Sequence, residues 1–172
     1  MKSPRELIGR IVTFVALFCG TLVLASCATS VPASGGGWPA YLRGDLVPEW
    51  ITLNIRWPAN DGCVEPPKHE RLVPGTLIDR FGSENGTFFS PKGEKFGARS
   101  VPYVCRKMEY RIYRVIRPLD VETCTIAPWF GEIGGGLQNK TEKPARALVA
   151  DGTLGLVTYV APNQSVPPPQ CE

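Results

Sequence analysis

The chain has 172 residues, of which 43% are hydrophobic and 20% are charged, and its formal net charge is +3. This balance is typical of a globular domain and excludes a disordered polyelectrolyte. No basic run and no stripe of alternating basic and aromatic residues occurs, so the sequence does not indicate a protein that binds nucleic acid. The 18 glycines and 17 prolines predict many turns and few long helices.

Residues 1–27 are predicted to be a signal peptide. A basic start, MKSPRELIGR, precedes the apolar segment IVTFVALFCGTLVLA, which is shorter than the roughly 20 residues of a spanning helix. The sequence LASC at residues 24–27 resembles a bacterial lipobox, which predicts lipidation of Cys27 and a membrane-anchored lipoprotein facing the periplasm or the cell surface. Ordinary cleavage after Ala28, giving a secreted protein, is the alternative. Residues 28–37 are rich in Gly, Ser and Pro and are expected to form a flexible tether.

The globular part is expected to span residues 38–160. Alternating Ile51, Leu53 and Ile55 predict a short strand, and the turn-rich residues 58–75 predict a loop. A further short strand is expected in residues 75–82, ending near Asp79, and the segment 83–102, punctuated by Gly and Pro, is expected to be an ordered loop.

The second half of the chain predicts more regular structure. Residues 108–119, MEYRIYRVIRPL, are rich in β-branched and aromatic side chains and predict a strand. Another strand is expected in residues 122–131, and residues 145–160 predict a helix or strand, a turn and a final strand. The tail 161–172 is too rich in Pro for regular structure to be expected there, and it is expected to be held by Cys171. The predicted fold class is α+β: one compact, sheet-dominated domain with long ordered loops.

Cysteine usage supports export. Beyond residue 27 the chain keeps four cysteines, an even number, which predicts two disulfides in an oxidising compartment. Three pairings are possible, and the sequence does not choose among them. Zinc binding is the competing interpretation, but there is no CxxC motif and the single histidine, His69, lies among charged residues. The candidate disulfide cysteines are Cys63, Cys105, Cys124 and Cys171.

Familiar catalytic motifs are absent. A single histidine without a G-x-S-x-G motif argues against a Ser-His-Asp hydrolase, and no phosphate-binding P-loop occurs. The remaining candidates are arginines, which pair with phosphates, aromatic rings, which stack on flat ligands, and an amide that follows three glycines. Taken singly, each has an ordinary structural alternative, such as pairing of Arg80 with Asp79. The candidates are Arg80, Phe81, Phe88, Arg99, Trp129, Phe130 and Gln138.

The order of these motifs resembles a known family. DRFGSENGTFFSPKG, then ARSVP, then APWFGEIGGGLQ follow one another as in the TNT domain, the family of the tuberculosis necrotizing toxin and of secreted fungal NAD glycohydrolases. The resemblance covers about residues 50–158. It implies cleavage of NAD at the nicotinamide–ribose bond, with NADP as a second candidate substrate, and a cognate inhibitor protein as partner.

The resemblance also implies residue roles. Arg80 and Phe81 match the family's Arg-Phe pair, Arg99 matches its second arginine, and Gln138 matches the glutamine on which activity depends. Phe88 departs from the family, since some members carry Tyr there. Arg80 and Gln138 are therefore the expected catalytic residues, with the aromatic residues and Arg99 binding the substrate.

The chemistry agrees with this set of residues. Nicotinamide leaves NAD as a neutral molecule, so no general acid, metal or cofactor is expected, and the transition state resembles an oxocarbenium ion. Two other interpretations stay open: a TNT-like module that binds a nucleotide or a partner without turnover, and a structural envelope lipoprotein.

Overall fold

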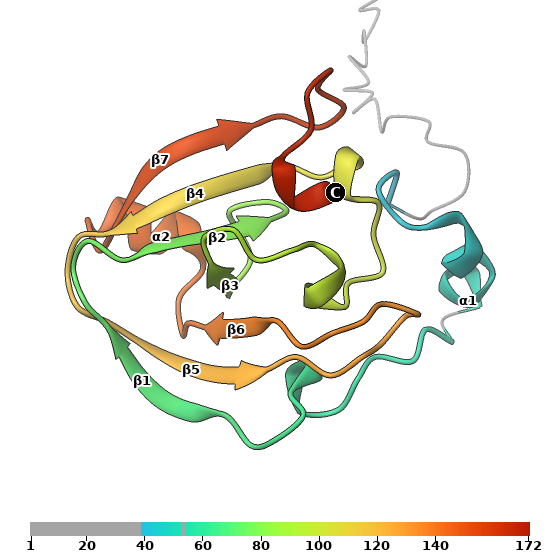
Figure 1. Ribbon diagram of the computed structural model, residues 1–172, viewed down its shortest axis with the longest axis horizontal. Helices are drawn as coiled ribbons and strands as arrows, with labels where there is room; N and C mark the ends of the chain where they lie inside the picture. Colours follow the sequence, from blue (N-terminus) through green and yellow to red (C-terminus); the bar gives the residue numbers. More distant parts are fainter. Residues whose placement is uncertain (1–38, 53) are drawn as a thin grey trace, which may run out of the picture. The chain divides into compact units, whose positions relative to one another are not determined.

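The computed structural model describes residues 39–52 and 54–172 (Figure 1). The predicted signal peptide, lipidation of Cys27 and the tether 28–37 lie outside the described residues. Within these two ranges, no helix has both the length and the apolar character needed to cross a membrane.

A single antiparallel sheet dominates the described part of the chain. Its seven strands lie in the order β1-β5-β6-β3-β2-β4-β7, so β1 and β7 form the two edges (Figure 1). This confirms the predicted sheet-dominated fold. The strands are β1 (Lys68–Leu72), β2 (Leu77–Phe81), β3 (Phe88–Pro91), β4 (Tyr110–Val115), β5 (Leu119–Thr125), β6 (Leu137–Lys140) and β7 (Leu154–Val160).

The core lies where the central strands meet the short helix α2 (Ala145–Ala150). Tyr113 and Val115 of β4 are completely buried, as are Ile78 of β2 and Ala145 of the helix. Burying one large apolar side chain contributes about 1.5–3 kcal/mol, so this cluster stabilises the centre of the sheet. Its members are Ile78, Phe89, Tyr113, Val115, Leu119, Val121, Ala145, Leu148 and Leu154.

The strand predicted around residues 51–55 is wrong. The structure instead has a short helix, α1 (Val47–Ile51), with Pro48 in its first turn. Proline fits this position because its missing N–H has no partner in the first turn of a helix. The Thr52 hydroxyl donates to the Pro48 carbonyl oxygen at 2.9 Å and helps to end the helix.

The loop predicted for residues 58–75 is also wrong in part, because β1 lies within it. This edge strand is almost entirely exposed and pairs with β5. Its side chains, KHERL, show no apolar alternation, and the strand is set by backbone pairing with its neighbour. Arg71 lies opposite Asp120 and forms an exposed ion pair with it at 2.6 Å. Charged side chains on an edge strand also discourage pairing with other chains.

The segment 83–102 is only partly loop. It contains β3 and a 3₁₀ turn, η3 (Gly97–Arg99), and the region after the three glycines continues as β6. Both strands are short, and each is defined by pairing with neighbours far away in the sequence. The predicted strands in the segments that form β2, β4, β5 and β7 are confirmed, although β2 extends beyond Asp79 to Phe81.

Two disulfides are present in residues 54–172, as predicted, and the structure decides their pairing. Cys63 is bonded to Cys124, and Cys105 to Cys171. The C-terminal tail is held by more than its disulfide, since the Phe96 N–H donates to the Gln170 carbonyl oxygen at 2.9 Å. Removal of a disulfide from a small exported domain typically costs about 2–5 kcal/mol.

Candidate active site

Two adjoining cavities form one cleft in the described part of the chain. Their volumes are about 190 and 420 Å³, and they have several lining residues in common. We call them together the cleft. The residues that line both cavities are Phe88, Arg99, Val101, Tyr103, Ile126 and Gln138.

Arg80 is a buried cation that lines the smaller cavity. Only 7% of the residue is exposed, its Nη1 donates to the Phe88 carbonyl oxygen at 3.3 Å, and its Nε has no partner. It forms no ion pair with any carboxylate among the described residues. Burial lowers the pKa of its guanidinium, because desolvation disfavours the charged form. A buried cation without a carboxylate partner carries a desolvation cost, and its place at a cavity wall is the physical setting in which proteins hold anions.

The position of Arg80 depends on two neighbours. Its guanidinium carbon lies 5.5 Å from the centre of the Phe89 ring. On another side lies Gly86, where an added Cβ would be only 2.0 Å from Nη2 of Arg80. Since no side chain fits there, residue 86 must be glycine for the guanidinium to occupy this place.

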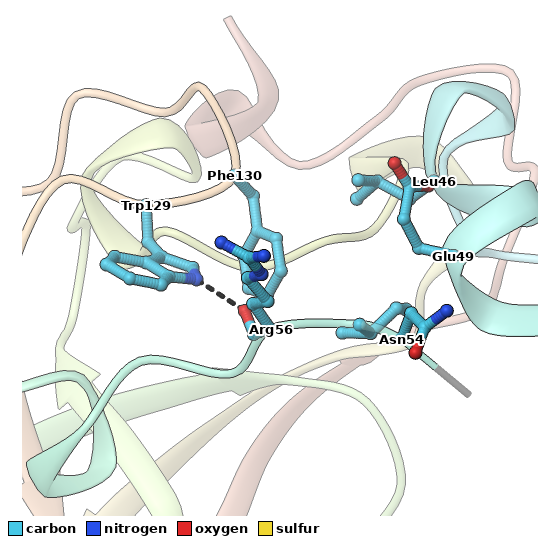
Figure 2. Close-up of a pocket in the computed structure, with 7 residues that line it drawn as sticks. Leu46, Glu49, Asn54, Arg56, Trp129 and Phe130 are labelled. Carbon is cyan, nitrogen blue, oxygen red and sulfur yellow. Dashed lines mark hydrogen bonds between the residues drawn. The ribbon is translucent and has the colours of Figure 1, made fainter. Parts of the chain in front are cut away.

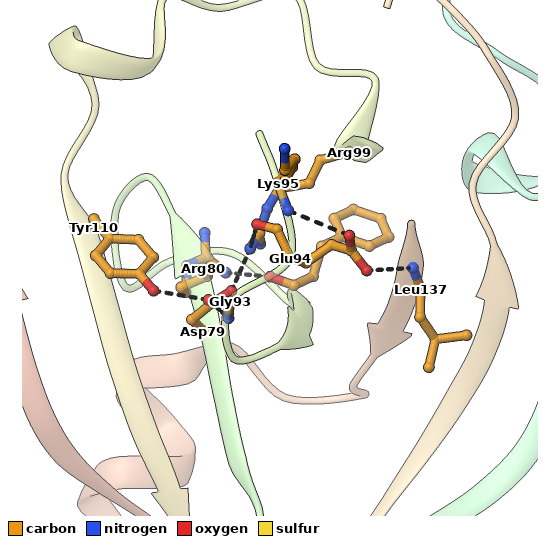
Figure 3. Close-up of polar contacts among 9 residues, drawn as sticks. Asp79, Arg80, Gly93, Glu94, Lys95, Arg99, Tyr110 and Leu137 are labelled. Atoms are coloured by element: carbon orange, nitrogen blue, oxygen red, sulfur yellow. Dashed lines mark hydrogen bonds and ion pairs between the residues drawn. The ribbon is translucent and has the colours of Figure 1, made fainter. Parts of the chain in front are cut away.

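Unlike Arg80, Arg99 is paired with a carboxylate (Figure 3). It lies on η3, and its Nη2 contacts the Asp79 carboxylate at 2.5 Å and the Glu94 carbonyl oxygen at 2.8 Å. Its guanidinium carbon lies 5.1 Å from the centre of the Phe81 ring. The carboxylate neutralises Arg99 and fixes it at the wall of the cleft.

Asp79 is the centre of this polar cluster. Its carboxylate is completely buried, and it also accepts hydrogen bonds from the Tyr110 hydroxyl at 2.8 Å and the Gly93 N–H at 2.9 Å (Figure 3). Burial, together with the neighbouring carboxylate, raises the pKa of the Tyr110 hydroxyl. Tyr110 therefore stays protonated and donates to Asp79 throughout the physiological pH range.

The three glycines bring β6 close to η3. A Cβ on Gly136 would lie 2.7 Å from the Ala98 carbonyl oxygen, which the Gly136 N–H contacts at 3.1 Å. Gly134 has a positive φ of 62°, and a Cβ there would lie 2.5 Å from the Pro128 nitrogen. Glycine is required at both places. The close approach sets Gln138 on β6 beside Arg99 on η3.

Gln138 lines both cavities. Its Nε2 donates to the Asp61 carbonyl oxygen at 3.2 Å. In the described part of the chain, no hydrogen bond reaches its Oε1. Because a carbonyl oxygen only accepts, the amide presents its NH₂ group to Asp61, and its oxygen keeps its capacity to accept a hydrogen bond.

Aromatic rings form the remaining walls. Phe81 lies against Phe96 with ring centres 4.9 Å apart, and Phe88 is 42% exposed. Phe130, which lines the larger cavity, has a positive φ of 52° and packs edge-on against Trp57 at 5.6 Å. A left-handed backbone at a bulky residue is strained, and such strain is typical of functional sites.

Trp129, which the sequence predicts to bind the substrate, does not line the cleft. Its indole N–H donates to the Arg56 carbonyl oxygen at 2.7 Å, and it lines a separate hollow of about 800 Å³ (Figure 2). The next residue, Phe130, lines both this hollow and the larger cavity of the cleft, whereas Trp129 lines only the hollow. The hydrogen bond fixes the indole away from Arg80 and Gln138.

The other predicted binding residues, including Phe81 and Phe88, all line the cleft. Sequence reasoning missed the contributions of Trp57 and Asp61 from the turn before Cys63, and of Tyr103. The available signal was the Asn-Asp-Gly turn directly before a cysteine. The cleft as a whole fits a ligand that carries both anionic groups and a flat ring.

Comparison with known proteins agrees with this description. The family model described as tuberculosis necrotizing toxin (TNT) matches residues 71–157, about half of the chain, so the chain belongs to the TNT family. It is 34% identical over 133 residues to the conidial surface nicotinamide adenine dinucleotide glycohydrolase nadA of Aspergillus fumigatus. That match covers 67% of this chain, which spans only 57% of the length of this curated relative.

Solved structures show a weaker likeness. Tuberculosis necrotizing toxin complexed with its immunity factor IFT is 18% identical, with 58% of this chain and 60% of that chain covered and a TM-score of 0.49. Rhs1-CT in complex with its cognate immunity protein RhsI1 is 16% identical, with 63% and 89% covered and a TM-score of 0.45. The family assignment rests on the family model.

Replacing Arg80 by Met tests whether Arg80 serves a ligand. Since the buried cation has no carboxylate partner, Arg80→Met should leave the free energy of unfolding within about 1 kcal/mol of wild type, or raise it. Pyrophosphate should raise the melting temperature of wild type and not that of the variant. Destabilisation of Arg80→Met by several kcal/mol would show that Arg80 has a structural role instead.

Replacing Asp79 by Asn tests the buried ion pair. Asp79→Asn leaves Arg99 without its carboxylate, so the free energy of unfolding in urea should fall by about 3–5 kcal/mol. Asp120→Asn is the matched control, because its pair with Arg71 is exposed and should contribute little. Equal urea midpoints for the two variants would contradict this account of Asp79.

Proposed function

We propose that the protein is an NAD glycohydrolase, which cleaves the bond between nicotinamide and ribose. The observation that carries the proposal is Arg80, a buried cation without a carboxylate partner in the cleft that Arg99 and Gln138 also line. Membership of the TNT family supports it, as does the similarity to a fungal protein named as an NAD glycohydrolase.

The proposed reaction breaks one bond and forms one. The bond from ribose C1′ to the pyridinium nitrogen breaks, and its electron pair goes to that nitrogen, so nicotinamide leaves as a neutral molecule. Water then adds to C1′ and loses a proton to solvent, which gives ADP-ribose. Because the leaving group needs no proton, the reaction is proposed to proceed without a general acid or a cofactor.

In this proposal the two arginines bind the pyrophosphate. Arg80 supplies a positive charge without a carboxylate partner among the described residues, and Arg99, held by Asp79, supplies a fixed donor that lines the same cavity. Charge-assisted hydrogen bonds from a guanidinium to phosphate oxygens are among the stronger polar contacts. Holding the pyrophosphate fixes the rest of the nucleotide relative to Gln138.

The nicotinamide ring is assigned to the aromatic walls, with Phe81 and Phe88 on the smaller cavity and Phe130 on the larger. Gln138 is assigned the catalytic position. Its free Oε1 would accept a hydrogen bond from a ribose hydroxyl or from the attacking water, and its dipole would stabilise the oxocarbenium-like sugar.

Partners and location are part of the proposal as well. The proposed substrate is NAD, and NADP is a second candidate. Because the chain belongs to the TNT family, a cognate inhibitor protein is an expected partner. Export, with or without a lipid anchor at Cys27, is supported by the predicted signal peptide and by the two disulfides, which persist in oxidising compartments.

The direct test is the release of nicotinamide. Purified protein is incubated with NAD, and separately with NADP, and the products are separated by chromatography. Stoichiometric nicotinamide and ADP-ribose are expected from NAD. Binding of NAD in a calorimetric titration without release of nicotinamide would favour the inactive TNT-like module. If NAD is neither bound nor cleaved, the structural lipoprotein is favoured.

Gln138→Ala should lower kcat by about 100-fold or more while the protein stays folded, because the variant loses an oriented acceptor at the reacting sugar. The control is Leu137→Ala, since the neighbouring strand position points to the other face and does not line the cleft. Nicotinamide release measures activity and circular dichroism measures the fold. Wild-type kcat in Gln138→Ala would refute this role.

Gly86→Ala should raise the KM for NAD by about tenfold or more, because the new methyl group displaces the Arg80 guanidinium. Gly44→Ala is the matched control, since a Cβ at that position would have nothing within 4 Å. Initial rates over a range of NAD concentrations give the KM of each variant. An unchanged KM in Gly86→Ala would mean that Arg80 does not bind the substrate.

A further inference from the structure

Gln138 is held from behind by a disulfide and a strained turn. Its Nε2 lies 4.0 Å from the sulfur of Cys63, 4.0 Å from that of Cys124 and 3.2 Å from the Asp61 carbonyl oxygen. Cys124 of β5 lies directly opposite Gln138 of β6 in the sheet register. The amide therefore packs against the Cys63–Cys124 disulfide, in which Cys63 lies 61 residues before Cys124 in the chain.

The turn that carries the Asp61 carbonyl is the 3₁₀ turn η2 (Asn60–Gly62). All three of its residues have positive φ, of 52°, 53° and 87°. Asn60 and Asp61 are not glycines, so this backbone is strained and needs outside contacts to persist. Asp61 and Gly62 also line the larger cavity.

Several contacts tie η2 to the sheet. The Ala127 N–H donates to the Gly62 carbonyl oxygen at 2.8 Å, and the Lys140 ammonium contacts the Asp61 carboxylate at 2.7 Å. The covalent tie is the Cys63–Cys124 disulfide, directly after the turn. Lys140 and Gln138 lie two residues apart on β6, so one strand holds both the side chain and the carbonyl of Asp61.

We propose that Cys63 and Cys124 are positioning residues for Gln138: their disulfide holds η2 so that the Asp61 carbonyl directs the amide oxygen of Gln138 into the cleft. The inference rests on the proposed function and deepens it. Full turnover is then acquired only when the two thiols are oxidised to the disulfide, by exchange with a disulfide oxidant that is reduced to two thiols. The chain with reduced Cys63 and Cys124 keeps its substrate-binding arginines and turns over slowly.

The second disulfide supplies a matched control. Cys105 and Cys171 are separated by 66 residues, and Cys63 and Cys124 by 61, so the two loops should stabilise the fold by similar amounts. Cys105 and Cys171 do not line the cleft. A loss that arises only from lower stability should therefore affect both double variants alike.

The test compares kcat and KM for NAD in wild type, Cys63→Ser/Cys124→Ser and Cys105→Ser/Cys171→Ser at a temperature where all three are folded. The first double variant should lose about 10- to 100-fold in kcat with KM changed less than about threefold, since a misplacement of about 1 Å can cost that much. The second should keep the wild-type kcat. Equal kcat in the two double variants, or a loss confined to KM, would overturn the inference.

A second measurement covers the case in which Cys63→Ser/Cys124→Ser does not fold. In the Cys105→Ser/Cys171→Ser background the Cys63–Cys124 disulfide is the one that remains among the described residues, and dithiothreitol is used to reduce it. Turnover should fall as two thiols appear, with the circular dichroism unchanged, and oxidised glutathione should restore it. Loss of the circular dichroism signal together with activity would mean that the disulfide only supports the fold.

The proposed function and the positioning role of the disulfide are tested by different outcomes. If wild type releases no nicotinamide, the proposed function is wrong and the positioning role fails with it. If wild type is active and its kcat does not depend on the Cys63–Cys124 disulfide, the positioning role alone is wrong.

Discussion

The cleft depends on which of two arginines pairs with the buried Asp79 carboxylate. Asp79 and Arg80 are neighbours in β2, but consecutive strand residues point to opposite faces, so they do not pair. Asp79 instead neutralises Arg99, which is 20 residues away. Arg80 is left buried without a carboxylate partner among the described residues, at a cost in desolvation. The cavity is therefore lined by two arginines in different states: Arg99 is neutralised by Asp79, and Arg80 has no carboxylate partner among the described residues.

Close backbone approach is the second constraint. Gly86 makes room for the Arg80 guanidinium, and Gly136 lets β6 contact the turn that carries Arg99. These glycines bring together segments that are distant in the chain, from residue 80 to residue 138. The site is thus built from short strands and turns whose relative positions are fixed by tight contacts, which suits a reaction that depends on orientation more than on proton transfer.

Local patterns are informative where a segment is rich in β-branched and aromatic side chains. Residues 110–115 and 154–160 are recognisable as strands for this reason, whereas the apolar alternation of Ile51, Leu53 and Ile55 is misleading. Local patterns do not reveal a strand that is defined by backbone pairing with its neighbours. Two strands are of this kind: β1, which is charged and exposed, and β3, which is four residues long. Trp129 shows the same limit for the site, because Phe130 lines the cleft and its neighbour Trp129 does not, and nothing in WFG tells them apart.

The sequence by itself determined the family, an even set of disulfide-forming cysteines and the residue types of the cleft, because motif order and composition are properties of the chain. Only the tertiary structure decided which cysteines pair, which arginine stays unneutralised and which face of Gln138 remains open. These depend on contacts such as Gln138 with Asp61, across 77 residues, and local sequence does not encode which distant groups meet.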